Sequence, residues 1–236
     1  MLVGHFAAAF GAKCLVAKRT EPALSLGTLV FAALLADVLA FTLVAAGIER
    51  FRVVTDVSRN RLIENIVFSH SLLMDILWGT LLALAYYLWR RHARGACILF
   101  AVVVSHWVLD VASHRPDMRI GPGIPGAFGL GLWNSIPATL LVEGGLWLLA
   151  IVLYVRGTRA NARAGIYAFW VGIVLLTLAW IGNISAPPSS GAGVAAFPSL
   201  IFFGCAIAWA YWMARARSSS SAYSAPAGVS SCLKKT

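Results

Sequence analysis

Residues 95–113 read GACILFAVVVSHWVLDVAS, and this stretch decides the fold class. It continues for 19 residues without a Lys or Arg, and a helix needs about 20 residues to cross the ~30 Å hydrocarbon core of a bilayer. Two polar residues, His106 and Asp110, interrupt it at a spacing of four. The stretch predicts a transmembrane helix, and its polar residues predict a partner that compensates them inside the membrane.

The same kind of apolar run recurs along the chain. Apolar residues make up 60% of the 236 residues and charged residues only 12%, whereas about a quarter of a soluble domain is charged. The runs are continuous and do not alternate as the strands of a membrane barrel do. We therefore expect an all-α, polytopic transmembrane bundle with about six spans: residues 24–46, 66–89, 95–113, 133–155, 165–184 and 194–213.

The two ends of the chain differ from these runs. Residues 1–17 are apolar but too short to span comfortably, so we expect a short N-terminal half-helix or a re-entrant segment. The last residues are rich in Ser and Ala and predict a disordered tail. The expected organisation is one integral membrane domain (1–213), comprising a metal-site part (1–155) and two accessory spans (165–213), followed by a cytoplasmic tail (214–236).

All nineteen basic residues lie between or outside the runs. With a cytoplasmic N-terminus, thirteen of them fall in cytoplasmic segments and six in outer loops. Because cytoplasmic loops are enriched in Lys and Arg, both termini are predicted to be cytoplasmic. The net charge of +10 is therefore explained by basic residues in the loops and tails of a protein in a lipid bilayer. We expect no nucleic-acid partner.

Four of the nine acidic residues fall inside the predicted spans: Asp37, Asp75, Asp110 and Glu143. A carboxylate in mid-membrane costs at least about 2.5–3.5 kcal/mol, and no Lys or Arg lies in any predicted span to offset it. Protonation, a bound metal cation and a water-filled cavity are the three ways to compensate such charges.

The placement of histidine favours the metal cation. His106, Asp110 and His114 are spaced i, i+4, i+8 and stack along one face of a helix. Imidazole nitrogen and carboxylate oxygen together suit a divalent ion, Zn²⁺ first and Mn²⁺ or Mg²⁺ next. The predicted depths also bring Asp37 and His70 to the outer half of the bundle.

Two further carboxylates are candidates for catalysis. Asp75 follows His70 by five residues, which is about 140° around a helix, so we expect it to face away from the metal ligands. Glu143 lies near the middle of the fourth span. Either carboxylate could serve as a general base if it is not a ligand.

Four short motifs occur in order in the first half of the chain. They are Gly4-His5, Leu34-Leu35-Ala36-Asp37, Phe68-Ser69-His70-Ser71-Leu72-Leu73 and Ser105-His106-Trp107-Val108-Leu109-Asp110. Their order resembles the bacterial membrane-bound, metal-dependent hydrolase-like family, also described as LexA-binding, inner-membrane-associated hydrolases. The resemblance covers residues 1–115, and it departs from the family where Ala36 replaces a frequent Pro.

The resemblance implies metal ligands at His5, Asp37, His70, His106 and Asp110, and a location in the bacterial inner membrane. The leading hypothesis is a metal-dependent hydrolase acting on a lipid-like or other membrane-accessible substrate. Two alternatives stay open. A transporter or a proton- or cation-conducting protein uses the same intramembrane residues, although neither a repeat nor a broken helix pair is evident in the sequence. A non-catalytic scaffold would use these residues only to join its helices.

Overall fold

The computed structural model describes residues 1–17, 24–53, 62–185 and 196–219, and the statements below concern these residues. They form eight α-helices: α1 (Leu2–Ala17), α2 (Leu26–Ala33), α3 (Leu35–Ala45), α4 (Leu72–Arg90), α5 (Ala93–Ser113), α6 (Ile136–Gly157), α7 (Arg163–Ser185) and α8 (Ala196–Ala216). Two small antiparallel hairpins pair β1 (Arg50–Val53) with β2 (Leu62–Asn65), and β3 (Thr158–Ala160) with β4 (Arg217–Ser219). A short 3₁₀ turn, Leu132–Asn134, precedes α6.

The prediction of an all-α polytopic bundle is confirmed. Among the described residues, five helices (α4 to α8) are long and apolar enough to cross a membrane, and α2 with α3 makes a sixth span if the pair is taken together. Most of the predicted tail, residues 220–236, lies outside the described residues. Its first part is ordered, because α8 continues to Ala216 and β4 follows it.

Two predicted spans differ from the structure. The span 24–46 is broken at Leu34, where α2 and α3 meet at a bend of 54°. The span 66–89 becomes helical only at Leu72, because the preceding residues form a turn in which the Ser69 side chain bonds to Glu49. The expectation that no broken helix pair exists was therefore wrong.

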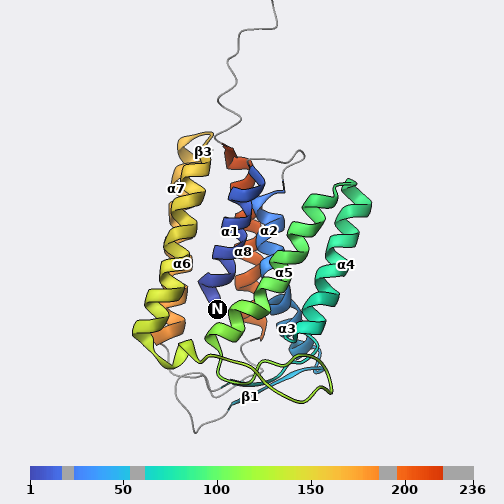
Figure 1. Ribbon diagram of the computed structural model, residues 1–236. Helices are drawn as coiled ribbons and strands as arrows, with labels where there is room; N and C mark the ends of the chain where they lie inside the picture. Colours follow the sequence, from blue (N-terminus) through green and yellow to red (C-terminus); the bar gives the residue numbers. More distant parts are fainter. Residues whose placement is uncertain (18–23, 54–61, 186–195, 220–236) are drawn as a thin grey trace, which may run out of the picture.

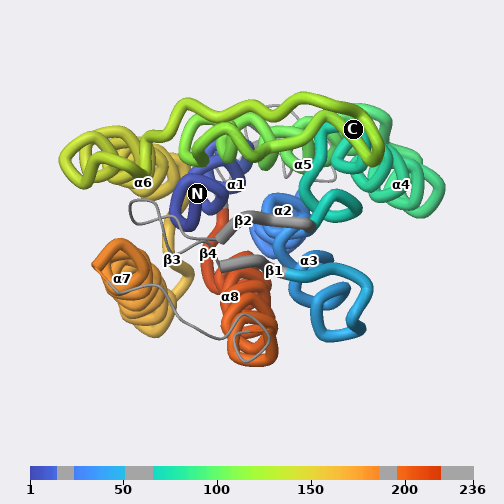
Figure 2. The backbone as a smooth tube through the Cα atoms, turned by 90° about the horizontal axis from the view of Figure 1, so that it is seen from below, coloured from blue at the N-terminus to red at the C-terminus, as the bar shows by residue number. Residues whose placement is uncertain are grey.

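The bundle has two layers, visible when it is viewed from one end (Figure 2). One layer holds α6, α1, α5 and α4; the other holds α7 and α8, with α2 and α3 against it. The short helix α1, at 16 residues about 24 Å long, is a single helix without a re-entrant turn. It lies in the centre, where Phe6 and Phe10 are fully buried and Phe10 packs against Trp147 and Tyr154.

Polar and apolar residues are distributed as a bilayer requires. Large apolar side chains such as Trp89 and Leu141, both 77% exposed, cover the outside, while several acidic and imidazole side chains are buried. The hairpin β1–β2 and the segment 115–132 lie at the lower end in Figure 1, and β3–β4 lies at the upper end. The polar interior described next belongs to the lower half.

Candidate metal centre

The break between α2 and α3 prepares one side of the centre. A helix leaves its last carbonyls without intrahelical donors, and Ala33, the last residue of α2, accepts a hydrogen bond from His106 Nδ1 at 2.8 Å. A carbonyl only accepts, so Nδ1 carries a proton, and in the neutral form of the ring His106 Nε2 presents its lone pair. Asp37 lies in the first turn of α3, immediately after the break.

A second chain of hydrogen bonds orients His70. Glu49 is buried, and its Oε1 accepts from the backbone N–H groups of Phe68 and Ser69 at 2.7 and 3.1 Å. Its Oε2 accepts from Ser69 Oγ at 2.6 Å, and Ser69 Oγ lies 3.1 Å from His70 Nδ1. Because the hydroxyl proton is used toward Glu49, His70 Nδ1 donates to Ser69, and Nε2 is left as the ligand atom. A carboxylate behind a ligating histidine is a common outer-shell arrangement in metal sites.

Four side-chain atoms from two helices, α3 and α5, and from the turn before α4 converge at this point. His106 Nε2 lies 3.3 Å from His70 Nε2, 3.2 Å from Asp110 Oδ2 and 3.9 Å from Asp37 Oδ1. His70 Nε2 lies 3.5 Å from Asp37 Oδ1 and 4.0 Å from Asp110 Oδ2. Bonds of about 2.0–2.2 Å in a tetrahedral zinc site place ligand atoms about 3.3–3.6 Å apart. Three of these five distances, 3.2, 3.3 and 3.5 Å, are close to that range, and the other two, 3.9 and 4.0 Å, exceed it. The four atoms therefore lie near ligand spacing, with His70, His106 and Asp110 forming one potential ligand group and Asp37 bordering it.

Most of this donor set is buried. The side chains of His70, His106 and Asp110 are 6% exposed or less, whereas that of Asp37 is 20% exposed and marks the open side. Both carboxylate oxygens of Asp75 and Nδ1 of His5 are buried without a hydrogen-bond partner in the described residues. Orphaned polar atoms beside a convergent donor set fit a site whose charge is balanced by a metal ion.

A second group of residues adjoins the first. The His5 ring stacks on His106 with centroids 3.7 Å apart and planes 3° apart, and His5 Nε2 lies 3.1 Å from Asp110 Oδ1. The Met1 nitrogen contacts the same oxygen at 2.5 Å. Glu143 accepts from the backbone N–H of Gly4 at 3.3 Å. His5, Asp37 and His106 form one potential ligand group, and His70, His106 and Asp110 form another.

The structure thus brings together five of the six predicted ligands: His5, Asp37, His70, His106 and Asp110. His114 is in neither group. The i, i+8 argument assumed a continuous helix, but α5 ends at Ser113 and His114 has extended backbone angles. Its ring pairs with Asp117 at 3.2 Å and packs against Trp133.

The expected orientation of Asp75 was also wrong. The angle of 140° required His70 and Asp75 to share a helix, whereas His70 precedes the start of α4. Asp75 is fully buried and interacts electrostatically with His70 and His106. Glu143 lies beside the second group, 1% exposed. The catalytic roles of Asp75 and Glu143 stay predictions.

Glu49 is the residue that sequence reasoning missed. It lies outside the predicted spans, and its link to His70 through Ser69 spans about twenty residues of chain. The serine immediately before His70 was the available signal, because a hydroxyl next to a ligand can relay a hydrogen bond from a carboxylate.

Comparison of the chain with protein-family models, curated proteins and solved structures found no match. The geometry of the centre therefore supports a metal site by itself, and the family suggested by the four motifs stays a prediction.

Proposed function

We propose that this chain is a membrane-embedded, metal-dependent hydrolase acting on a lipid-like or other membrane-accessible substrate. The observation that carries the proposal is the convergence of Asp37, His70, His106 and Asp110 near ligand spacing inside the bundle. A divalent ion bound there lowers the pKa of a water molecule toward about 7 and polarises a phosphoryl or acyl oxygen. Zn²⁺ suits the mixed nitrogen and oxygen donors best.

Other residues of the protein orient the ligands and supply a general base. His106 and His70 are held in the required tautomers by Ala33 and by Ser69 with Glu49. Asp75 is buried close to the donors and has unpartnered oxygens, so it is the better placed general base for a water proton. Glu143 is the alternative base, on the His5 side of the centre.

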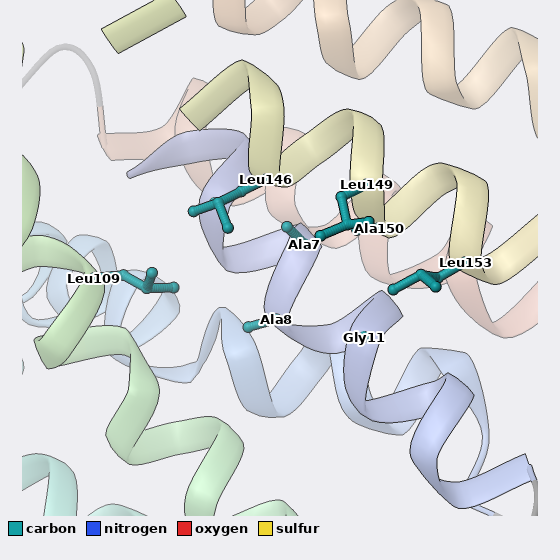
Figure 3. A pocket seen from close by; sticks show the side chains of 9 residues that line it. Ala7, Ala8, Gly11, Leu109, Leu146, Leu149, Ala150 and Leu153 are labelled. Carbon is teal, nitrogen blue, oxygen red and sulfur yellow. The ribbon is translucent and has the colours of Figure 1, made fainter. Parts of the chain in front are cut away.

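An apolar groove supports a lipid-like substrate. It has a volume of about 190 Å³ and lies between α1, α5 and α6, where it is lined by Ala7, Ala8 and Gly11 of α1, Leu109 of α5 and leucines of α6 (Figure 3). Its lining includes Gly4 and Leu109, the sequence neighbours of His5 and Asp110. From Gly4 to Gly11 the groove follows α1 for about 10 Å. An acyl chain lying in it would bring its polar end to the metal centre.

We further propose a bacterial inner-membrane location with the β3–β4 end in the cytoplasm. Arg156, Arg159, Arg163, Arg215 and Arg217 gather at this end of α6, α7 and α8, in agreement with the positive-inside rule. The resemblance to inner-membrane hydrolases supports the same assignment. A cysteine introduced at Arg159 should react with a membrane-impermeant thiol reagent only after the inner membrane is opened.

The direct test is metal analysis of detergent-purified protein. We expect wild-type protein to retain close to a full equivalent of a transition metal and His106→Ala to retain less than about 0.2 equivalents. His92→Asn is the matched control, because His92 only caps α5 through Gly95 and asparagine preserves a cap. Equal metal contents in wild type and His106→Ala would remove the basis of the proposal.

The groove is tested with Gly11→Leu. A Cβ added at Gly11 meets nothing within 4 Å, and the same is true of the exposed Gly145 on α6. The leucine at position 11 should fill the groove and raise the KM for long-chain substrates about 5- to 30-fold, as expected for loss of one or two kcal/mol of apolar binding. Gly145→Leu should leave KM unchanged, and metal content should be normal in both. An equal effect of the two substitutions would exclude the groove as the substrate site.

A second candidate function is supported by one observation, the bend between α2 and α3. Broken helices beside intramembrane carboxylates also line cation paths in transporters, and Asp37 follows this break. This candidate predicts cation or proton flux in proteoliposomes that is lost in Asp37→Asn. Hydrolysis without flux would favour the enzyme, and flux without hydrolysis would favour the transporter.

A further inference from the structure

The Asp110 carboxylate lies between two parallel imidazoles. Its Oδ2 is 3.2 Å from His106 Nε2 and its Oδ1 is 3.1 Å from His5 Nε2. The two rings are stacked 3.7 Å apart and are parallel to within 3°. Each oxygen of the Asp110 carboxylate therefore faces the nitrogen of one imidazole ring. The separation of the two rings is similar to the distance of about 3.5–4 Å between the two ions of two-metal sites.

The His5 side of Asp110 already attracts a positive charge. The Met1 amino group lies 2.5 Å from Asp110 Oδ1 and 3.0 Å from His5 Nε2. An ammonium group only donates, so His5 Nε2 offers its lone pair here. Two acceptors only 3.1 Å apart repel each other unless a cation lies between them. The Met1 amino group is that cation here, and a metal ion held by the same two atoms would displace it or bind it as a neutral amine.

The charge around the centre exceeds what one divalent ion neutralises. Asp37, Asp110, Glu143 and Asp75 carry four negative charges if all are ionised, whereas one divalent ion and the Met1 ammonium group together supply three positive charges. In the described part of the chain their side-chain contacts are with histidines, backbone N–H groups, Trp133 and the Met1 amino group, not with Lys or Arg. Uncompensated buried charge is strongly destabilising, and two divalent ions would balance four carboxylates.

We propose that the centre binds two divalent cations and that Asp110 bridges them. Asp37, His70, His106 and Asp110 Oδ2 hold the first ion. His5 Nε2 and Asp110 Oδ1 hold the second, with Glu143 beside it. The inference rests on the proposed metal site. It adds a second ion position, formed by residues other than Asp37, His70 and His106.

The test is a titration of metal-depleted, detergent-purified full-length protein with Mn²⁺, followed by equilibrium dialysis and electron paramagnetic resonance. Wild type should bind about two equivalents and show the exchange-coupled spectrum of two nearby ions. His5→Gln should bind one equivalent with the spectrum of an isolated ion, because glutamine keeps the volume but replaces the imidazole ligand. Glu143→Gln should weaken only the second equivalent, at least about tenfold, and His92→Asn should behave as wild type.

The outcomes separate this inference from the proposed function. One uncoupled equivalent in wild type, unchanged in His5→Gln, would overturn the second position and leave the first intact, with the Met1 amino group as the balancing charge. Absence of binding in wild type would overturn both proposals. If His5→Gln does not elute as a monodisperse protein, the Glu143→Gln variant decides the question. A lower affinity for the second Mn²⁺ equivalent alone supports the inference, and unchanged affinities for both equivalents contradict it.

Discussion

Helices α5 and α7 are nearly equal in length, at 21 and 23 residues, and both are apolar enough to cross a membrane. They differ in what they bury. The inward face of α5 includes His106 and Asp110, whereas the inward face of α7 carries glycine, aliphatic and aromatic residues such as Gly172 and Trp180. The apolar composition that allows both helices to cross a membrane therefore does not indicate which of them carries the functional residues.

The two helices are also held in different ways. Trp209 of α8 packs against α7, where its Nε1 donates to the Ala168 carbonyl at 3.0 Å, and Trp147 of α6 donates to Thr177 at 3.0 Å. Close packing and isolated hydrogen bonds are the usual means of association in a bilayer. In contrast, α5 contacts α3 and α1 through a cluster of ionisable groups that could hold a metal ion, and it contacts α2 through the hydrogen bond from His106 to the Ala33 carbonyl. Changes in α5 should therefore affect metal binding, and changes in α7 should affect only stability.

The largest effect is expected from Asp110→Asn. The substitution keeps the side-chain volume but removes the negative charge that contacts His106, His5 and the Met1 amino group. Transition-metal content should fall below about 0.2 equivalents, measured on detergent-purified protein. Asp117→Asn is the matched control, because Asp117 pairs with His114 and Arg115; it should keep its metal. Equal losses in both variants would contradict the assignment.

A smaller effect is expected from Glu49→Gln, which alters the residue behind Ser69 and His70. The amide preserves an acceptor for the backbone N–H groups but removes the charge that orients the relay. Metal affinity should fall about 10- to 100-fold, as for other outer-shell carboxylates, measured by competition with a chelator. Ser71→Ala is the control, because Ser71 Oγ donates to the Val67 carbonyl and, among the described residues, not to the Glu49 relay. Unchanged affinity in Glu49→Gln would show that the relay does not support His70.

The smallest effect is expected from Thr177→Val in α7, which removes the hydrogen bond from Trp147. Interhelical hydrogen bonds in membranes contribute about 0.6 kcal/mol on average, so thermal stability should decrease slightly and metal content should stay the same. Thr80→Val is the control, because Thr80 bonds only within α4. A tenfold loss of metal affinity in Thr177→Val would refute the separation between the two regions.

Much of the fold was predictable because bilayer thickness imposes a length on each apolar run. The predicted spans 95–113 and 165–184 agree with α5 and α7 to within two residues at each end. The break at Leu34 was not predictable in the same way. Neither Pro nor Gly, the usual causes of a kink, occurs at positions 33–35, and the freed Ala33 carbonyl has its donor on a helix about seventy residues away.

The candidate site was predictable only as a set of residue types. Four intramembrane carboxylates without a basic partner required compensation, and the i, i+4 spacing of His106 and Asp110 placed two donors together on one helix. Helical periodicity gave the wrong positions for His114 and Asp75. A helix end separates His114 from Asp110 and separates Asp75 from His70, so neither pair lies on one continuous helix. The role of Glu49 depended on a turn that no local pattern revealed.

By itself, then, the sequence determined that the chain forms a polytopic helical bundle and that its first four spans carry the buried charges, because hydrophobic length and the cost of charge in a bilayer act on each segment separately. Tertiary structure alone decided that α1 lies in the centre, that α2 and α3 bend, and that His5, Asp37, His70, His106 and Asp110 converge. Ligand spacing of a few ångströms depends on how helices from distant parts of the chain pack, and packing is a property of the whole bundle.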